Sequence, residues 1–275
     1  MPPMDTKALS PRPLLPALKA VRGTFDSAGY RLDLLLQVVA RLPAIWKRRA
    51  LINDQLYVGG IKVVHVVLLV GFSIGMVVSL QTGLELARIG QQDQIGTLVA
   101  LSMAREMGPF ITATILAAAV GSALAAELGT MAVSEELAAL EVLSIDRVSF
   151  LVMPRVVALA ILCPTLTILC DAIGIVGGSF VARSQLGVGL QLYYDTALES
   201  LQEPSQFFGL PKDVYAGLFK SFVFGILISI ISCSAGVLAE GGALGVGNAT
   251  RSAVRDSIIL VIIMNYFMTW FFYQQ

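Results

Sequence analysis

The chain has 275 residues, of which 56% are hydrophobic and only 14% are charged, and its mean hydropathy is +0.78. This composition excludes an ordinary soluble domain of that size. Lys plus Arg and Asp plus Glu each number 19, so the net charge is zero, and we expect no nucleic acid among the partners. The sequence predicts an all-α integral membrane protein.

The N-terminal region divides into two predicted parts. Residues 1–27 begin with a proline-rich stretch that lacks the apolar core of a signal peptide, so a cytoplasmic segment is expected. Residues 28–56 contain apolar side chains near helical spacing with polar ones between them, which favours an amphipathic helix on the membrane surface, with Trp46 at the headgroups. A plain soluble helix packed on another element is the alternative. The apolar positions are Leu32, Leu35, Leu36, Val39 and Leu42.

The remainder, residues 57–275, is predicted to be one domain of five membrane-spanning helices. Charge-free apolar stretches indicate spans near residues 62–85, 107–126, 156–182, 221–239 and 257–275, and only Asp171 interrupts the third. Small residues four apart allow neighbouring helices to approach closely in lipid. The predicted packing positions are Gly71 and Gly75 in the first span and Ala117, Gly121 and Ala125 in the second.

A short polar stretch follows the second span. Ser134 is an N-cap candidate, Glu135 and Glu136 follow it, and Leu137 and Leu140 form an apolar edge. The pattern predicts a short amphipathic helix outside the bilayer, between the second and third spans.

The distribution of basic residues predicts the orientation. With the N-terminus in the cytoplasm, fourteen of the nineteen Lys and Arg residues would be cytoplasmic, as the positive-inside rule favours. The helix at 134–143 would then be cytoplasmic, the loop at 184–211 would face outward, and the C-terminus would be periplasmic. The glycine-rich residues 241–250 are interpreted as a tight cytoplasmic turn.

No motif for catalysis or nucleotide binding is present. The sequence lacks GxxxxGK[ST], GxGxxG, HExxH, GxSxG and CxxC, so neither an enzyme nor a nucleotide-binding chain is expected. Cys163, Cys170 and Cys233 lie in apolar runs, and His65 has no ligand at metal-binding spacing. We expect no disulfide, no metal and no cofactor on this chain.

Several motifs, taken in order along the chain, resemble the MlaE/YrbE family of ABC-transporter permeases. They are REMGP at 105–109, GSALAAELGTM at 121–131, SEELAALEVL at 134–143, KSFVFG at 220–225, GVGNAT at 245–250 and NYFMT at 265–269. The resemblance implies the permease subunit of a transporter that moves phospholipid or a related lipid between a bacterial inner membrane and the outer envelope. It further implies a homodimer, a separate ATPase that binds ATP and Mg, and an MCE-domain periplasmic protein, and it allows a small STAS-like accessory subunit.

The resemblance also assigns roles to residues. It implies that Ser134, Glu135, Glu136, Leu137 and Leu140 form a helix that couples to the ATPase. It implies that the first span lines a lipid cavity between two copies of the chain, through Phe72, Met76, Leu80 and Gln81. The chain departs from the usual family pattern at Ala119, Ala132, Ala138 and Asn265, where relatives commonly have charged residues, so the polar contacts at these positions are expected to differ.

Two alternatives remain open at this point. A proton-coupled secondary transporter would use intramembrane acids, for which Glu127 and Asp171 are the candidates. A membrane scaffold that only recruits partners is the other.

Overall fold

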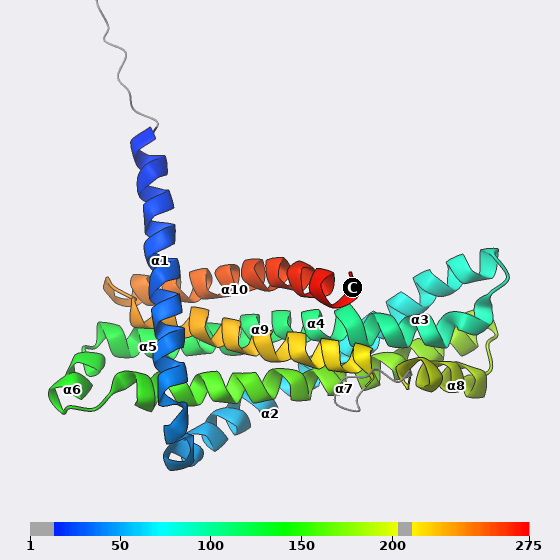
Figure 1. The fold of residues 1–275 in the computed structure, drawn as a ribbon, viewed down its shortest axis with the longest axis horizontal. Helices are drawn as coiled ribbons and strands as arrows, with labels where there is room; N and C mark the ends of the chain where they lie inside the picture. Colours follow the sequence, from blue (N-terminus) through cyan, green and yellow to red (C-terminus); the bar gives the residue numbers. More distant parts are fainter. Residues whose placement is uncertain (1–13, 203–210, 275) are drawn as a thin grey trace, which may run out of the picture.

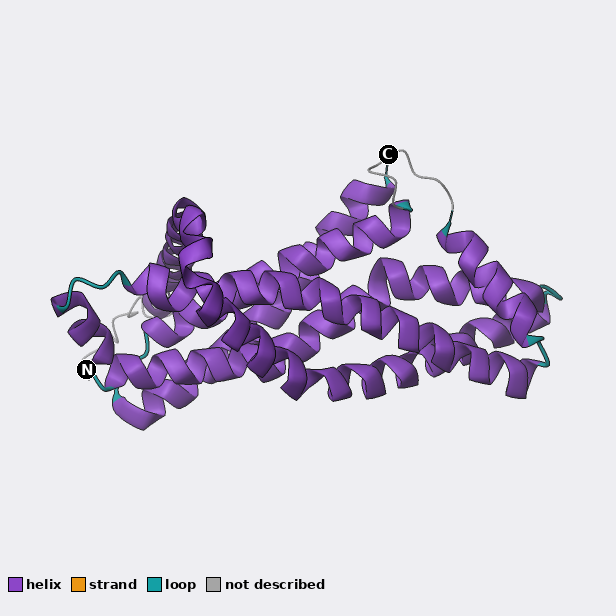
Figure 2. Ribbon diagram, turned by 90° about the horizontal axis from the view of Figure 1, so that it is seen from below, coloured by secondary structure: helices purple, strands orange, loops and turns teal. Residues whose placement is uncertain are grey.

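The structure is a computed structural model that describes residues 14–202 and 211–274. Within these ranges the chain is helical apart from short connections and contains no strand (Figure 2). Five helical stretches of the described residues are long and apolar enough to cross a membrane, which confirms the predicted all-α membrane architecture (Figure 1). They are Arg49–Arg88, Gln92–Val133, Val148–Leu186, Lys212–Val237 and Gly242–Tyr273.

The first span, α2 (Arg49–Arg88), packs closely against α7 (Met153–Leu186). A side chain at Gly75 would overlap the carbonyl oxygen of Gly174, and one at Gly177 would overlap that of Phe72. Ser79 Oγ adds a hydrogen bond to the carbonyl oxygen of Gly178 at 2.8 Å. The two backbones can therefore approach only because small residues form the contact. The buried face of α2 repeats every four residues over most of its length: Gly59, Val63, Val67, Gly71, Gly75, Ser79 and Gly83.

The second span is a composite helix. It consists of α3 (Ile95–Ser102), α4 (Gly108–Leu116) and α5 (Ser122–Val133), joined by π-helical turns at Met103–Met107 and Ala117–Gly121. Ala117 and Ala125 are fully buried, and Gly121 faces Ser232 of α9 (Lys212–Val237). The helix begins well before the predicted residue 107, because Arg105 and Glu106 have partners inside the bundle.

Two connections differ from the sequence-based prediction. The predicted turn at 241–250 is wrong, because α10 (Gly242–Tyr273) begins there and only residues 238–241 connect it to α9. The segment at 184–211 is also not a plain loop, since it contains α8 (Leu190–Leu201). Tyr193 of α8 is fully buried, and its hydroxyl donates to the carbonyl oxygen of Ile175 at 3.0 Å. In Figure 1, α3 and α8 lie at the end of the bundle opposite α6 (Glu136–Val142).

The N-terminal helix α1 (Leu14–Arg41) crosses the long helices steeply near the α6 end, so it runs roughly in the plane of a membrane that the bundle spans (Figure 1). Leu34 and Val38 pack on the bundle and are 2% exposed. The apolar Leu32 and Leu36 stay exposed, as does Trp46 in the 3-10 helix Leu42–Arg48. This exposed apolar surface favours the interfacial helix over the soluble alternative. The expected boundaries at 27/28 and 56/57 fall inside α1 and α2. Residues 1–13 lie outside the described part.

Candidate functional site

The helix α6 lies at one end of the bundle and begins differently from the prediction. The N-cap position is occupied by Glu135, whose φ is 61°, and no side chain caps the helix. Ser134 instead closes α5, because its hydroxyl lies 2.9 Å from the carbonyl oxygen of Thr130 and 3.0 Å from the Glu136 carboxylate. The predicted N-cap role of Ser134 is therefore wrong, and the left-handed Glu135 makes the sharp turn between α5 and α6.

The side chains of α6 separate into an inner and an outer face. Leu137 is buried against its own chain, where it lines a small cavity together with Tyr30 of α1 and Val237 of α9. Leu140 is partly buried, whereas Glu135 and Glu136 are exposed. Leu137 therefore anchors the helix, and the two acids, like Ser134, are exposed members of the predicted coupling set that a partner could contact.

The segment after α6 is joined to α1 by one ion pair and to α6 by another. Asp146 accepts from Arg41 and from the backbone N–H of Val148, and Arg147 pairs with Glu141 at 2.8 Å. Burial alone would raise the pKa of the Asp146 carboxyl, but the hydrogen bonds and the charge of Arg41 outweigh it and hold that pKa below its usual range. These contacts fix α6 relative to the surface helix.

A polar cluster inside the bundle was not predicted. The Glu106 carboxylate accepts hydrogen bonds from Lys220 Nζ at 2.7 Å, Asn265 Nδ2 at 2.8 Å and Thr269 Oγ1 at 2.7 Å. Lys220 is fully buried and also donates to the Arg105 carbonyl oxygen at 3.0 Å. That oxygen lacks its normal helical partner, because Pro109, four residues later, has no N–H.

A second ion pair extends the cluster. Arg105 binds Asp213 through two hydrogen bonds of 2.7 and 2.8 Å, and the Tyr273 hydroxyl donates to Asp213 at 2.8 Å. The cluster balances two cations with two acids and ties α9 and α10 to the π-helical turn of the second span. We define the polar cluster as Arg105, Glu106, Asp213, Lys220, Asn265, Thr269 and Tyr273.

One sequence signal could have indicated this cluster. Asn265, Thr269 and Tyr273 recur every four residues in an otherwise apolar span, which places them on one face of α10. Asn265, one of the departures from the family pattern, is thus a hydrogen-bond donor to Glu106. Ala119 and Ala138, two of the other departures, are exposed.

The four predicted lipid-binding residues lie in different surroundings in the described part of the chain. Phe72 lines a groove of about 490 Å³ between α2 and α7, together with Phe180 and Arg183. Met76 is partly buried, and Leu80 and Gln81 are exposed on α2. His65 is also exposed on this helix. A cavity that uses all four positions requires a second copy and stays a prediction.

The two acids considered for proton coupling have different surroundings. Glu127 pairs with Arg155 at 3.1 Å, so it has a fixed cationic partner. Asp171 Oδ1 is buried and has no hydrogen-bond partner in the described part of the chain. It lies against Gly108, where a side chain would overlap the carboxylate.

Comparison with known proteins places the chain in a family. Residues 52–271 match the family described as Permease MlaE. A probable ABC transporter permease of Synechocystis is 39% identical over 221 residues, which cover 80% of this chain and 81% of the relative. A probable ABC transporter permease of Rickettsia bellii is 40% identical over 225 residues, covering 82% and 84%. The chloroplastic protein trigalactosyldiacylglycerol 1 of Arabidopsis thaliana is 38% identical over 221 residues, covering 80% and 61%. The chain therefore belongs to the MlaE family of ABC transporter permeases.

Proposed function

We propose that the chain is the membrane subunit of a transporter that moves phospholipid or a related lipid between the inner membrane and the outer envelope of a bacterium. It works as a homodimer with a separate ATPase that binds ATP and Mg, and with an MCE-domain periplasmic protein. The observation behind this proposal is the geometry of α6 in an ABC permease. Leu137 anchors the helix within the chain, and the carboxylates of Glu135 and Glu136 remain exposed for an ATPase subunit.

Lipid is the substrate class that the apolar surfaces support best. The spans α2 and α10 are the least buried of the five, and they expose apolar side chains such as Leu69 and Phe267. Two copies meeting through these helices would enclose an apolar cavity, where each buried CH₂ of an acyl chain contributes about 0.8 kcal/mol. The name of the plant relative, which refers to a galactolipid, supports the same substrate class.

The test is ATP-dependent lipid movement in vesicles that contain the chain and its ATPase. Glu136→Lys should reduce ATPase binding by tenfold or more and abolish lipid movement, because it reverses the charge of an exposed docking residue. The fold should survive, since the change buries no charge. The measurements are a pull-down of the ATPase, release of a fluorescent phospholipid and a thermal melt.

Glu199→Lys is the matched control, because Glu199 is an exposed acid on α8 at the opposite end of the bundle. It should leave ATPase binding and lipid movement unchanged. Undiminished binding and transport by Glu136→Lys would show that α6 is not the coupling element. An unmodified complex that hydrolyses ATP without moving lipid would remove the lipid assignment.

A further inference from the structure

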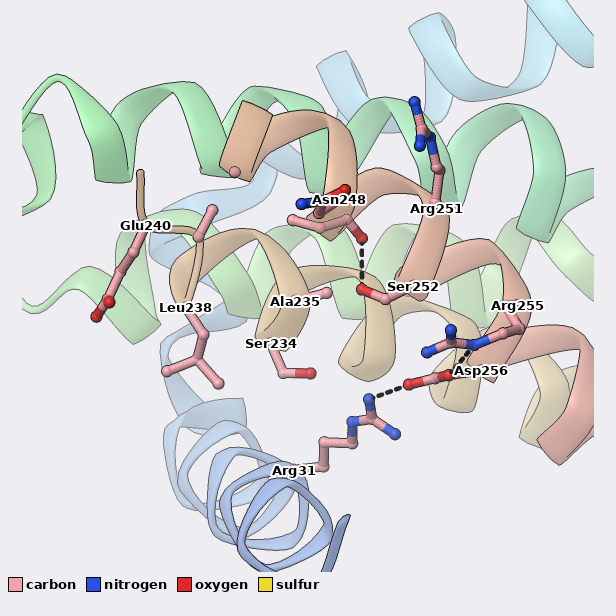
Figure 3. Close-up of a pocket in the computed structure, with 13 residues that line it drawn as sticks. Arg31, Ser234, Ala235, Leu238, Glu240, Asn248, Arg251, Ser252, Arg255 and Asp256 are labelled. Carbon is pink, nitrogen blue, oxygen red and sulfur yellow. Dashed lines mark hydrogen bonds and ion pairs between the residues drawn. The ribbon is translucent and has the colours of Figure 1, made fainter. Parts of the chain in front are cut away.

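A pocket of about 680 Å³ lies near the α6 end of the bundle, where α1, α9 and α10 meet (Figure 3). Its walls include three arginines, Arg31 from α1 and Arg251 and Arg255 from α10. The volume lies within the range of small-ligand sites. The pocket is separate from the polar cluster, from α6 and from the Phe72 groove.

The arginines are partly organised by one acid. Asp256 accepts from Arg31 Nη2 at 2.6 Å and from Arg255 Nε at 3.1 Å, so it holds these two guanidinium groups on either side of itself (Figure 3). Arg251 lies one turn earlier on α10 and has no hydrogen-bond or ion-pair partner among the described residues. Glu240 also lines the pocket, but Figure 3 shows its carboxylate directed away from the arginines. Figure 3 also shows the guanidinium group of Arg251 directed away from Arg31 and Arg255; the Arg251 side chain is exposed and can change rotamer.

This arrangement leaves an excess of positive charge. One carboxylate serves two guanidinium groups, and the third cation, Arg251, has no partner among the described residues. Arg251 and Arg255 are four residues apart on one helix, a spacing at which like charges are destabilising. An anion bound among them would relieve the repulsion, and the free guanidinium N–H groups match the oxygens of a phosphate.

The position in the bundle identifies the source of that phosphate. Residues 257–273 of α10 contain no charged side chain and extend over roughly 25 Å, close to the thickness of the hydrocarbon core. Arg251, Arg255 and Asp256 therefore lie at the headgroup level, and α1 runs along the same level (Figure 1). The pocket also has an apolar part, formed by Ala235, Leu238 and Ala239. A lipid places its phosphate and its acyl chains on opposite sides of this boundary.

We propose that this pocket binds the headgroup of an anionic phospholipid, in the leaflet that the proposed orientation makes cytoplasmic. Arg31 and Arg255 hold the phosphate, the exposed side chain of Arg251 turns toward it by a change of rotamer, and Leu238 contacts the start of the acyl chains. Such a lipid joins α1 to the ends of α9 and α10, next to the segment that positions α6. The site is distinct from the transport cavity, and lipid binding here does not depend on ATP.

The test uses the purified chain alone in a neutral detergent, so a failure of the transport proposal leaves it unaffected. The probes are dioctanoyl phosphatidylglycerol, dioctanoyl phosphatidylcholine and inorganic phosphate, and the readouts are the shift in Tm and the number of retained lipids by native mass spectrometry. Phosphatidylglycerol should raise the Tm in proportion to the logarithm of its concentration once the site is saturated. Phosphatidylcholine and inorganic phosphate at equal concentration should have a much smaller effect.

Arg251→Gln and the double variant Arg251→Gln/Arg255→Gln test the site itself. We expect the double variant to weaken phosphatidylglycerol binding by tenfold or more, and the single variant to weaken it less. Arg251 is exposed and has no partner in the part of the chain that the structure describes, so the single variant should fold normally. Arg88→Gln is the matched control, because Arg88 is an exposed arginine at the C-terminal end of α2 and does not line the pocket.

Three results would overturn the proposal. One is an unchanged phosphatidylglycerol response in the double variant. Another is an equal response to phosphatidylcholine, which would make the arginines irrelevant to recognition. The third is an equal response to inorganic phosphate, which would assign the pocket to a soluble phosphate compound instead of a lipid.

Discussion

At the scale of single residues, Lys220 is the most deeply buried charged side chain in the described part of the chain. Its ammonium group is fully buried among membrane-spanning helices and has acceptors in Glu106, in the Arg105 carbonyl and in Thr269. A buried ion pair contributes little net stability by itself, but removing one partner leaves the other charge uncompensated. We therefore expect the stability of the protein to fall when one partner of the pair is replaced, and to fall less when both are replaced together.

We predict that Lys220→Met lowers the free energy of unfolding by about 3 kcal/mol, because Glu106 then lacks its cation. The double variant Lys220→Met/Glu106→Gln should recover at least half of this loss, since no uncompensated charge remains. Unfolding of the purified chain in detergent, followed by circular dichroism, measures both values.

The exposed pair of Glu85 and Arg88, at 2.9 Å, supplies the comparison. Arg88→Gln should change the free energy of unfolding by less than about 1 kcal/mol, as is usual for surface ion pairs. If Lys220→Met is no more harmful than Arg88→Gln, the ion pair of Lys220 and Glu106 does not stabilise the bundle.

The sequence could not reveal this pair, for a physical reason. A span is recognised by its lack of charge, so Arg105, Glu106 and Lys220 were interpreted as residues flanking the spans. In the structure the helices continue through these positions, because Glu106 and Lys220 neutralise each other across 114 positions of the chain. Asp171 was recognised because it stands alone within an apolar run.

At the scale of helices, glycine determines how closely α2 and α7 approach. The contact is backbone to backbone around Gly75 and Gly174, and α7 has further glycines at 177 and 178. In lipid the association of helices depends on such close packing, because apolar side chains alone gain nothing over contact with acyl chains.

We predict that Gly75→Ala destabilises the protein by about 1–3 kcal/mol, because the added Cβ overlaps the backbone of Gly174, which cannot move aside as a flexible side chain could. Gly247→Ala is the control, since Gly247 is within α10 and has no atom near its missing Cβ. This control should be neutral or stabilising, because alanine favours helices. Thermal melts in detergent compare the two. Equal stability of both variants would mean that α2 and α7 can separate without cost.

The glycines of α2 and α10 also show how far the sequence could predict helix contacts and turns. The spacing of Gly71 and Gly75 within an apolar run indicated a helix contact, and both are buried in the structure. Glycines at 245 and 247 follow a span end, and there the same residue type was interpreted as a turn, although α10 includes them. Glycine marks both helix contacts and turns, and only the tertiary partners decide between them.

At the scale of the whole molecule, the two ends of the bundle are chemically different. One end contains α6, α1 and the pocket lined by Arg31, Arg251 and Arg255, and the other contains α3 and α8 (Figure 1). The proposed ATPase must bind at the α6 end, and the anionic headgroup site lies near it. The ATPase site and the leaflet assigned to the headgroup site therefore depend on the same orientation, which the distribution of Lys and Arg supports.

Labelling with a membrane-impermeant thiol reagent tests that orientation in intact cells. The three native cysteines, Cys163, Cys170 and Cys233, are free and buried, so they should contribute little background. Glu199→Cys, at an exposed position of α8, should react from outside. Asn248→Cys, exposed at the opposite end of the bundle, should react only after the inner membrane is permeabilised. Each substitution is at an exposed position, so the fold should not be affected.

The expected pattern follows from the single span, α9, that lies between the two labelled positions. Along the chain, α8 follows the third span and Asn248 follows the fourth. The two positions must therefore lie on opposite sides of the membrane. Reaction of both variants before permeabilisation would contradict the five-span topology itself. The reverse pattern would keep the topology but place α6 outside the cell, where no ATP is available, and the exposed acids of α6 could then not serve an ATPase.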